Sequence, residues 1–223
     1  MYPTAMDSAR QEAGSAFLVC QKRVEVVQAY YLLSLYPIPA RRWEEDRSWI
    51  FLGQAIRVAV DMNLHHPNTA KPQDEPHARE MLNRTRAWLN VYNLDRSLGS
   101  QYGKMAIINN SDYVASHSHD WWCTSEYNLE NFDIHTCVYN AELRILSGFL
   151  KDVYSDPEHP TGLNKVGPNH VTIRLPLNLP PSVRKLISGG SQVKLMTNLR
   201  SRGNNGSVNL KRQILTNRRT VIV

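Results

Sequence analysis

Residues 84–112 read RTRAWLNVYNLDRSLGSQYGKMAIINNSD, and this stretch decides the fold. Its first half continues a pattern that starts near residue 77, in which the side chains of one face recur at steps of three or four: Met81, Thr85, Trp88 and Tyr92. That spacing matches the period of an α-helix, about 3.6 residues. Because Gly99 and Gly103 then interrupt the pattern, we predict one long helix over residues 77–100 followed by a loop.

Two charged residues sit inside this helical pattern. Asp95 follows Tyr92 by three residues and so falls on the same face as Trp88. A buried carboxylate needs a partner, because losing its hydration costs on the order of several kcal/mol. Arginine is the expected partner, since its planar guanidinium can hold a carboxylate by two hydrogen bonds. Arg96 lies on an adjacent face and can instead pair with another helix. We interpret both residues as structural ion pairs that fix helix packing; a role in ligand sensing is the alternative.

Working outward, two helical patterns precede this stretch. The first has its face at Phe17, Cys20, Val24, Val27, Tyr31 and Leu35. Pro37 and Pro39 end it, because proline has no N–H to donate. The second begins after the capping residues Asp46 and Ser48, is stopped by Pro67, and has its face at Trp49, Leu52, Ile56, Val60 and Leu64. Within it, Gly53 predicts a point of close helix approach. The pair His65-His66 is expected to cap its C-terminal end.

A further pattern follows over residues 131–154, with one face formed by Phe132, His135, Tyr139, Leu143, Leu146, Leu150 and Val153. On this face His135 is expected to be a hydrogen-bonded core histidine. Four helical patterns and no strand-like alternation predict an all-α fold, a bundle or array of helices. No apolar run is long enough to span a membrane, and the first residues lack the basic and apolar regions of a secretory signal.

The charge of the chain changes abruptly near residue 165. Residues 1–165 hold 16 Lys and Arg against 20 Asp and Glu, whereas residues 166–223 hold 10 Lys and Arg with no acid and no aromatic residue. We therefore predict a helical domain over 1–165 and a disordered basic tail over 166–223, because such a composition buries little apolar surface. An intron or a shifted reading frame is our preferred explanation of the tail. A basic arm that binds nucleic acid, or a nuclear import signal, is the alternative.

Few residues suggest catalytic or metal chemistry. His117, His119 and Cys123 are of types that zinc prefers, but no second ligand pair accompanies them, so we interpret them as a solvated loop. No Gly-x-Ser-x-Gly nucleophile turn and no phosphate-binding loop is present. We predict that the chain is not an enzyme and that it has no catalytic, cofactor-binding or metal-binding residues.

Two stretches resemble the middle homology, or regulatory, region of fungal zinc binuclear cluster transcription factors. The first is RSWIFLGQAIRVAVDMNLHH, residues 47–66, with Trp49, Leu64 and His65; the second is residues 84–112. The second resembles the family order of arginines, an aromatic, Leu-Asp-Arg, Gly-Arg-Pro, an isoleucine and an aspartate. Those places are filled by Arg84, Arg86, Trp88, Leu94, Asp95, Arg96, Gly103, Lys104, Met105, Ile107 or Ile108, and Asp112.

The resemblance covers about residues 15–165 and implies a nuclear regulatory domain of an RNA polymerase II transcription factor. The partners that it implies are the transcription machinery or regulatory proteins, with a small-molecule effector as a further class. Lys104-Met105 replaces the usual Arg-Pro, and Tyr113-Val114 follows Asp112 where Val-Pro is usual. The six-cysteine zinc cluster of the family has no counterpart among three dispersed cysteines, so zinc and DNA are expected only through that missing cluster. The alternative is a helical scaffold or interaction protein with a nucleic-acid-binding tail.

Overall fold

A computed structural model describes residues 2–154, 156–160 and 162. In these residues it has six α-helices and two short 3-10 helices, and no strand: α1 Tyr2–Leu18, α2 Val24–Leu35, η1 Trp43–Glu45, α3 Ser48–Asp61, α4 Glu75–Tyr102, α5 Tyr113–Ser116, η2 Trp121–Cys123 and α6 Glu130–Val153. The predicted all-α fold is confirmed. The predicted tail over residues 166–223, and the boundary before it, lie outside the described residues.

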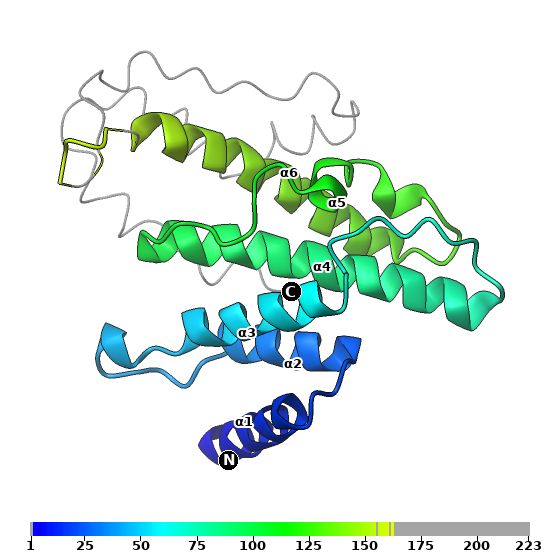
Figure 1. The fold of residues 1–223 in the computed structure, drawn as a ribbon, viewed down its shortest axis with the longest axis horizontal. Helices are drawn as coiled ribbons and strands as arrows, with labels where there is room; N and C mark the ends of the chain where they lie inside the picture. The colour runs from blue at the N-terminus through cyan, green and yellow to red at the C-terminus, as the bar shows by residue number, and fades with distance from the viewer. Residues whose placement is uncertain (1, 155, 161, 163–223) are drawn as a thin grey trace.

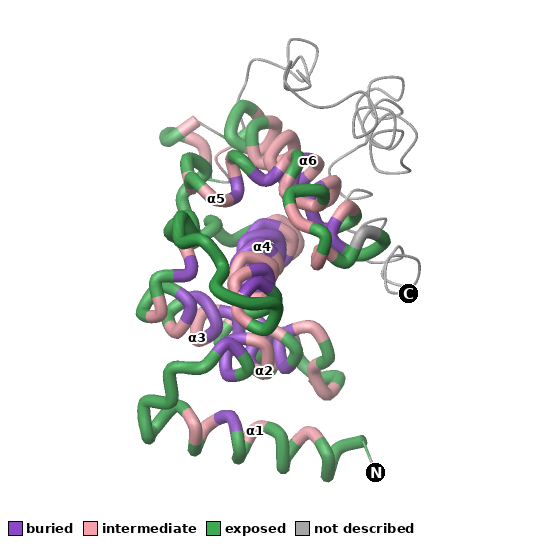
Figure 2. Tube along the Cα trace, turned by 90° about the vertical axis from the view of Figure 1, so that its right-hand side faces the viewer, coloured by how far each residue is buried: buried purple, intermediate pink, exposed green. Residues whose placement is uncertain are grey.

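The helices lie in layers around α4, the longest helix (Figure 1). On one side α4 packs against α2 and α3, and on the other side it packs against α5 and α6. Viewed nearly along α4, its purple, buried residues occupy the centre of the molecule, and α1 lies outermost against α2 (Figure 2). No described helix is long and apolar enough to cross a lipid bilayer. The helix that the motif stretch predicts is therefore the central element of the fold.

Local sequence explains where α4 begins and ends. The Asp74 carboxylate accepts the backbone N–H of His77 at 2.9 Å, and Pro76 lies in the first turn, where no N–H is needed. Gly103 ends the helix in the left-handed conformation, with φ +62°. Gly99 was predicted to interrupt the helix, but it lies inside it. A Cβ at Gly99 would come within 3.0 Å of the Lys104 carbonyl oxygen, so this glycine permits the following loop to pack closely.

Alanine at two glycines should have opposite effects on stability. Gly103→Ala places a side chain at positive φ and should lower the free energy of unfolding by about 1 kcal/mol. Gly53 lies within α3, and a Cβ there meets nothing within 4 Å, so it does not mark the close helix approach predicted for it. Gly53→Ala should therefore raise stability by about 1 kcal/mol, the difference in helix propensity. Urea unfolding of both variants measures this, and a stabilising Gly103→Ala would contradict it.

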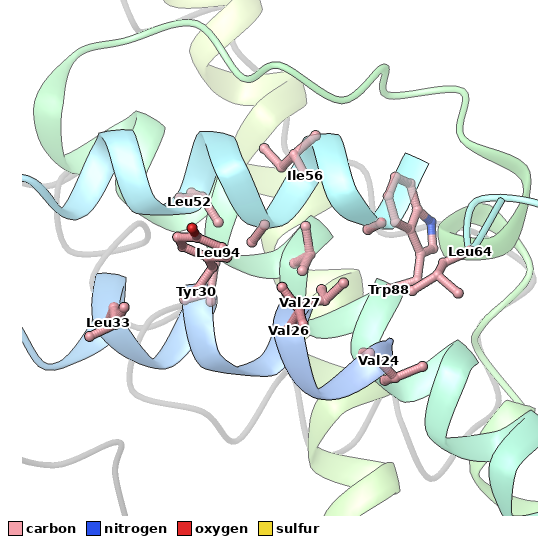
Figure 3. Close-up of a cluster of buried hydrophobic side chains, with 14 of the residues drawn as sticks. Val24, Val26, Val27, Tyr30, Leu33, Leu52, Ile56, Leu64, Trp88 and Leu94 are labelled. Carbon is pink, nitrogen blue, oxygen red and sulfur yellow. The ribbon is translucent and has the colours of Figure 1, made fainter. Parts of the chain in front are cut away.

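The main core lies between α2, α3 and α4 (Figure 3). Val27 of α2, Leu52 of α3 and Trp88 of α4 are all buried there. Burying an aliphatic or aromatic side chain of this size contributes about 1.5–3 kcal/mol. The face predicted for α3 is confirmed at Leu52, Ile56 and Leu64, but Val60 is exposed. Trp88 lies beside Leu64, so residues of both motif stretches meet in this core.

The pattern predicted as one helix from Phe17 to Leu35 is two helices. The Ala16 carbonyl accepts the Gln21 N–H, and the Phe17 carbonyl accepts the Cys20 N–H. Cys20 itself has φ +53°. This is the Schellman arrangement, in which a left-handed residue closes a helix end. The prediction was wrong because the spacing of apolar residues continues across the break.

Helix α3 ends in the same way, at Asn63, which has φ +56°. The Leu64 N–H reaches the Ala59 carbonyl at 2.9 Å, and Leu64 is buried against the core. The helix therefore stops at Asp61 and does not run on to Pro67. Asparagine tolerates the left-handed conformation better than most residues, which explains a stop at this position.

The buried face of α6 is more polar than predicted. Phe132 and His135 are exposed, so His135 is not a core histidine. The face toward the rest of the domain instead buries several polar residues together with Cys137 and Leu143: Asp133, Thr136 and Asn140. The predicted face is confirmed at Leu143 and is wrong at the start of the helix, where hydrogen bonds from α4 to Asp133 and to Thr136 decide which side is buried.

Candidate functional site

The family-like residues of α4 hold three neighbouring parts of the fold. The first is the end of α3, where the Arg84 guanidinium donates to the Met62 carbonyl at 2.9 Å. Helix-terminal carbonyls lack partners within their own helix, so this bond satisfies one of them. His65 was predicted to do this. Its ring instead lies 5.9 Å from the Trp88 ring, and its Nδ1 atom is buried with no hydrogen-bond partner within the described residues.

The second contact joins α4 to the start of α6. Arg86 donates to both carboxylate oxygens of Asp133, from Nε at 2.6 Å and from Nη2 at 2.9 Å. Asp133 has a fully buried side chain and also accepts from the Asn128 side chain and the Leu129 N–H. The Arg86 guanidinium lies 5.6 Å from the centre of the Trp121 ring. The pairing is bidentate, which fixes both the distance and the orientation of the two helices.

These hydrogen bonds set the pKa of Asp133. Burial by itself raises the pKa of this carboxyl, but the hydrogen bonds from Arg86, Asn128 and Leu129 outweigh burial and hold it below its ordinary value. The carboxylate is therefore ionised in the folded domain. Sequence reasoning did not single out Asp133. The one local signal was an acidic residue in the first turn of a predicted helix.

Acid is expected to destabilise the domain through Asp133. The unfolded carboxyl has a pKa near 3.9, and the folded pKa is lower. The stabilisation is therefore present above about pH 4 and is lost as the pH falls through the folded pKa. Urea unfolding between about pH 3 and pH 7 measures it. Arg86→Ala, which lacks the pair, should show a flatter pH dependence, and equal slopes in the two proteins would contradict this role.

The third contact is a clamp on the loop after α4, formed by Asp95 and Arg96. Each oxygen of the fully buried Asp95 carboxylate accepts a backbone N–H, from Ile107 at 3.0 Å and from Ile108 at 2.8 Å. The expected arginine partner is present but more distant, because Arg96 Nη1 lies 3.3 Å from Asp95. Burial raises the pKa of the Asp95 carboxyl, against the lowering effect of these amides and of Arg96.

Arg96 completes the clamp from the same helix. Its Nη2 donates to the Ile108 carbonyl at 2.9 Å and to the Asn110 side chain at 2.8 Å. Its guanidinium stacks on the Tyr92 ring at 3.6 Å from the ring centre. Both charges are buried, so the pair costs desolvation and contributes mainly a unique loop conformation. Arg96 was expected to be able to pair with another helix, but it bonds the loop of its own helix.

Trp88 and Asp112 close the same loop at its far end. The Trp88 indole N–H donates to the Asp112 carboxylate at 3.0 Å, and the same carboxylate oxygen caps α5 by accepting the Ala115 N–H at 2.8 Å. Leu94 is buried in the core cluster and Trp49 packs against it. Lys104 lies 6.0 Å from the Trp49 ring centre. All of these motif residues therefore make contacts within the domain.

The histidine-rich loop does not bring metal ligands together. The His117 ring stacks on Tyr113, His119 faces Asp120 at 3.6 Å, and Cys123 is exposed. Within the described residues no group of three His, Cys, Asp or Glu side chains could hold a metal ion. What the motif residues form is a set of intramolecular ion pairs and hydrogen bonds around α4.

Comparison with known sequences identifies the family of this chain. Residues 8–135 match the fungal specific transcription factor domain, and this range contains both motif stretches. The chain belongs to this family. The matched range contains the whole of α4. The match ends within α6, shortly after Asp133.

Two curated proteins are similar to this chain. Protein priB of Lentinula edodes is 26% identical over 144 residues, which cover 62% of this chain and 24% of that protein. The transcriptional regulatory protein SEF1 of Candida albicans is 28% identical over 100 residues, which cover 42% of this chain and 11% of that protein. The matched part thus spans a quarter or less of each relative. No solved structure matches this chain.

Proposed function

We propose that this domain modulates transcription by RNA polymerase II, in the nucleus, when it is covalently linked to a zinc-cluster DNA-binding domain. The family match over residues 8–135 carries the proposal. The similarity to a transcriptional regulatory protein supports it. In this view the domain itself does not read DNA, and DNA is reached through the linked cluster. The domain is a protein-binding regulatory module and not an enzyme.

The contacts around α4 support a scaffold role for the motif residues. Arg86 donates hydrogen bonds to Asp133. Asp95 accepts from the backbone amides of the loop, and Arg96 donates to oxygen atoms of the same loop. Because these side chains bond other parts of the domain, they fix helix packing and leave recognition to the outer helix faces. The proposed partners are the transcription machinery or other regulatory proteins. A small-molecule effector is a further class, which would act by changing the packing around α4.

A tethering experiment tests this function. Residues 1–165 are fused to an unrelated DNA-binding domain, and a reporter gene with the matching sites is measured against that domain alone. The fusion should change the reporter output, in either direction. Arg86→Ala should abolish the change, whereas Arg79→Ala, on the same helix in an exposed pair with Glu75, should keep it. A fusion at normal abundance with unchanged output would contradict the proposal.

The charge of the tail favours a second candidate function, nucleic-acid binding by residues 166–223. The tail holds ten basic residues and no acidic residue, so its net positive charge would attract phosphates. If the tail binds DNA or RNA, the affinity should fall steeply with salt. For duplex DNA, the logarithm of the binding constant should fall with the logarithm of the salt concentration by about 0.9 per phosphate contacted. Binding should also vanish when the chain is cut after Lys165. Binding that survives this deletion would reject the tail as the site.

A further inference from the structure

Helix α1 is only lightly attached to the rest of the domain. Of its 17 residues, Ala13 alone is buried. Its contacts with α2 form an antiparallel hairpin, because residues early in α1 lie beside residues late in α2 (Figures 1 and 2). Tyr2 donates to the Tyr36 carbonyl at 2.6 Å, and Tyr30 donates to the Ala13 carbonyl at 3.0 Å. Such a helix is marginal by itself in water and depends on the surface that it covers.

The contacts under α1 are weak for a core. Phe17 meets Tyr30 edge-on at 6.3 Å between ring centres, and Arg10 lies 5.7 Å from the Phe51 ring centre. The Arg10 Nε atom is buried there without a hydrogen-bond partner among the described residues. An unsatisfied buried donor reduces the gain from closing this interface.

The connection between α1 and α2 is under conformational strain. Cys20 adopts φ +53°, a conformation that costs a residue with a Cβ atom about 1 kcal/mol or more. Beside it lies a run of three exposed apolar side chains: Phe17, Leu18 and Val19, at 42%, 81% and 66% exposure. Opening the connection would relieve the strain at Cys20. The same connection in a second copy of the chain, also open and lying alongside, would cover Phe17, Leu18 and Val19.

We propose that α1 exchanges between two copies of this chain, so that each α1 packs on the α2 and α3 of its partner. The occupant is a second copy because the surface under α1 already fits α1 itself, through Ala13, Phe17 and Tyr2. The exchanged dimer keeps these contacts, removes the left-handed Cys20, and buries Phe17, Leu18 and Val19 between the two connections. The closed form predominates in dilute solution, since a short connection gives α1 a high effective concentration beside its own α2.

Shortening the connection tests the exchange. Deleting residues 19–22 leaves one residue between α1 and α2, fewer than the 2–5 residues that join two antiparallel helices. Helix α1 then cannot fold back on its own α2, but it can still pack on a partner. The full chain with this deletion should have twice the monomer mass by light scattering. Its helix content, measured by circular dichroism, should equal that of the unaltered chain. A folded monomer with this deletion would overturn the proposal.

Two further variants keep the test decisive if the deletion impairs folding. Cys20→Gly makes the left-handed turn unstrained, so the dimer fraction at high concentration should fall at least several-fold relative to the unaltered chain. Removing residues 1–23 should leave a monomer at every concentration. Dimer formation that is unchanged by both variants would show an interface elsewhere and would overturn the proposal.

Discussion

Arg86→Ala should lower the free energy of unfolding by about 3–5 kcal/mol, because it leaves the Asp133 carboxylate buried without its cation. Asp133 is fully buried, and the two remaining donors, Asn128 and Leu129, are neutral. The loss is large because the charge that stays behind cannot reach water. Urea unfolding followed by circular dichroism measures the change. Part of the loss should disappear when Asp133 is also replaced, as in the double variant with Asp133→Asn.

The matched control for this variant is Arg79→Ala. Arg79 lies on the same helix and pairs with Glu75 at 2.8 Å, but both side chains are more than half exposed. Its guanidinium also lies over the Tyr127 ring. Exposed pairs of this kind contribute about 0–1 kcal/mol. Equal losses for the two arginine variants would mean that the pair of Arg86 with Asp133 does not hold α4 to α6.

Asp95→Ala should have a comparable effect, a loss of about 3–5 kcal/mol. It removes the acceptor of two backbone N–H groups, those of Ile107 and Ile108, and leaves the buried Arg96 without its carboxylate. Each unsatisfied buried donor adds about 1–3 kcal/mol to the cost. The loop should also lose its fixed conformation. Proteolysis of the variant at Lys104, under conditions in which the domain stays folded, would detect this.

Asp61→Ala provides the comparison for Asp95→Ala. Asp61 pairs with Lys22 at 2.9 Å on the surface, with both side chains exposed. Its loss should change stability by less than about 1 kcal/mol and should leave the loop resistant to proteolysis. If Asp95→Ala behaved like this surface variant, Asp95 would not clamp the loop.

The central helix and the family were predictable from sequence, because the deciding signals are local. Asp74, Pro76 and Gly103 mark the ends of α4 by their own conformational preferences. The burial of Trp88 followed from helical spacing. The resemblance to the family lies in two continuous stretches, both inside the matched range, so the family could be recognised without knowing the fold.

What could not be predicted depends on partners that are distant along the chain. Asp133 meets Arg86 across 47 residues, and no spacing rule connects the two. Asp95 was expected to bind an arginine, but its nearest partners are two backbone amides, which every residue except proline carries. The break after α1 was missed because Cys20, unlike glycine, gives no warning of a left-handed turn.

The central claim is that Asp95 and Arg96 of α4 clamp the loop that follows this helix. Residue-resolved amide hydrogen exchange of the intact chain tests this directly at Ile107 and Ile108. Both amides lie in a loop, and Ile107 as a residue is 54% exposed, yet both amides are bonded to the buried Asp95 carboxylate. They should exchange as slowly as amides in the middle of α4. Exchange as fast as in an unstructured peptide would contradict the clamp and the structural role assigned to Asp95 and Arg96.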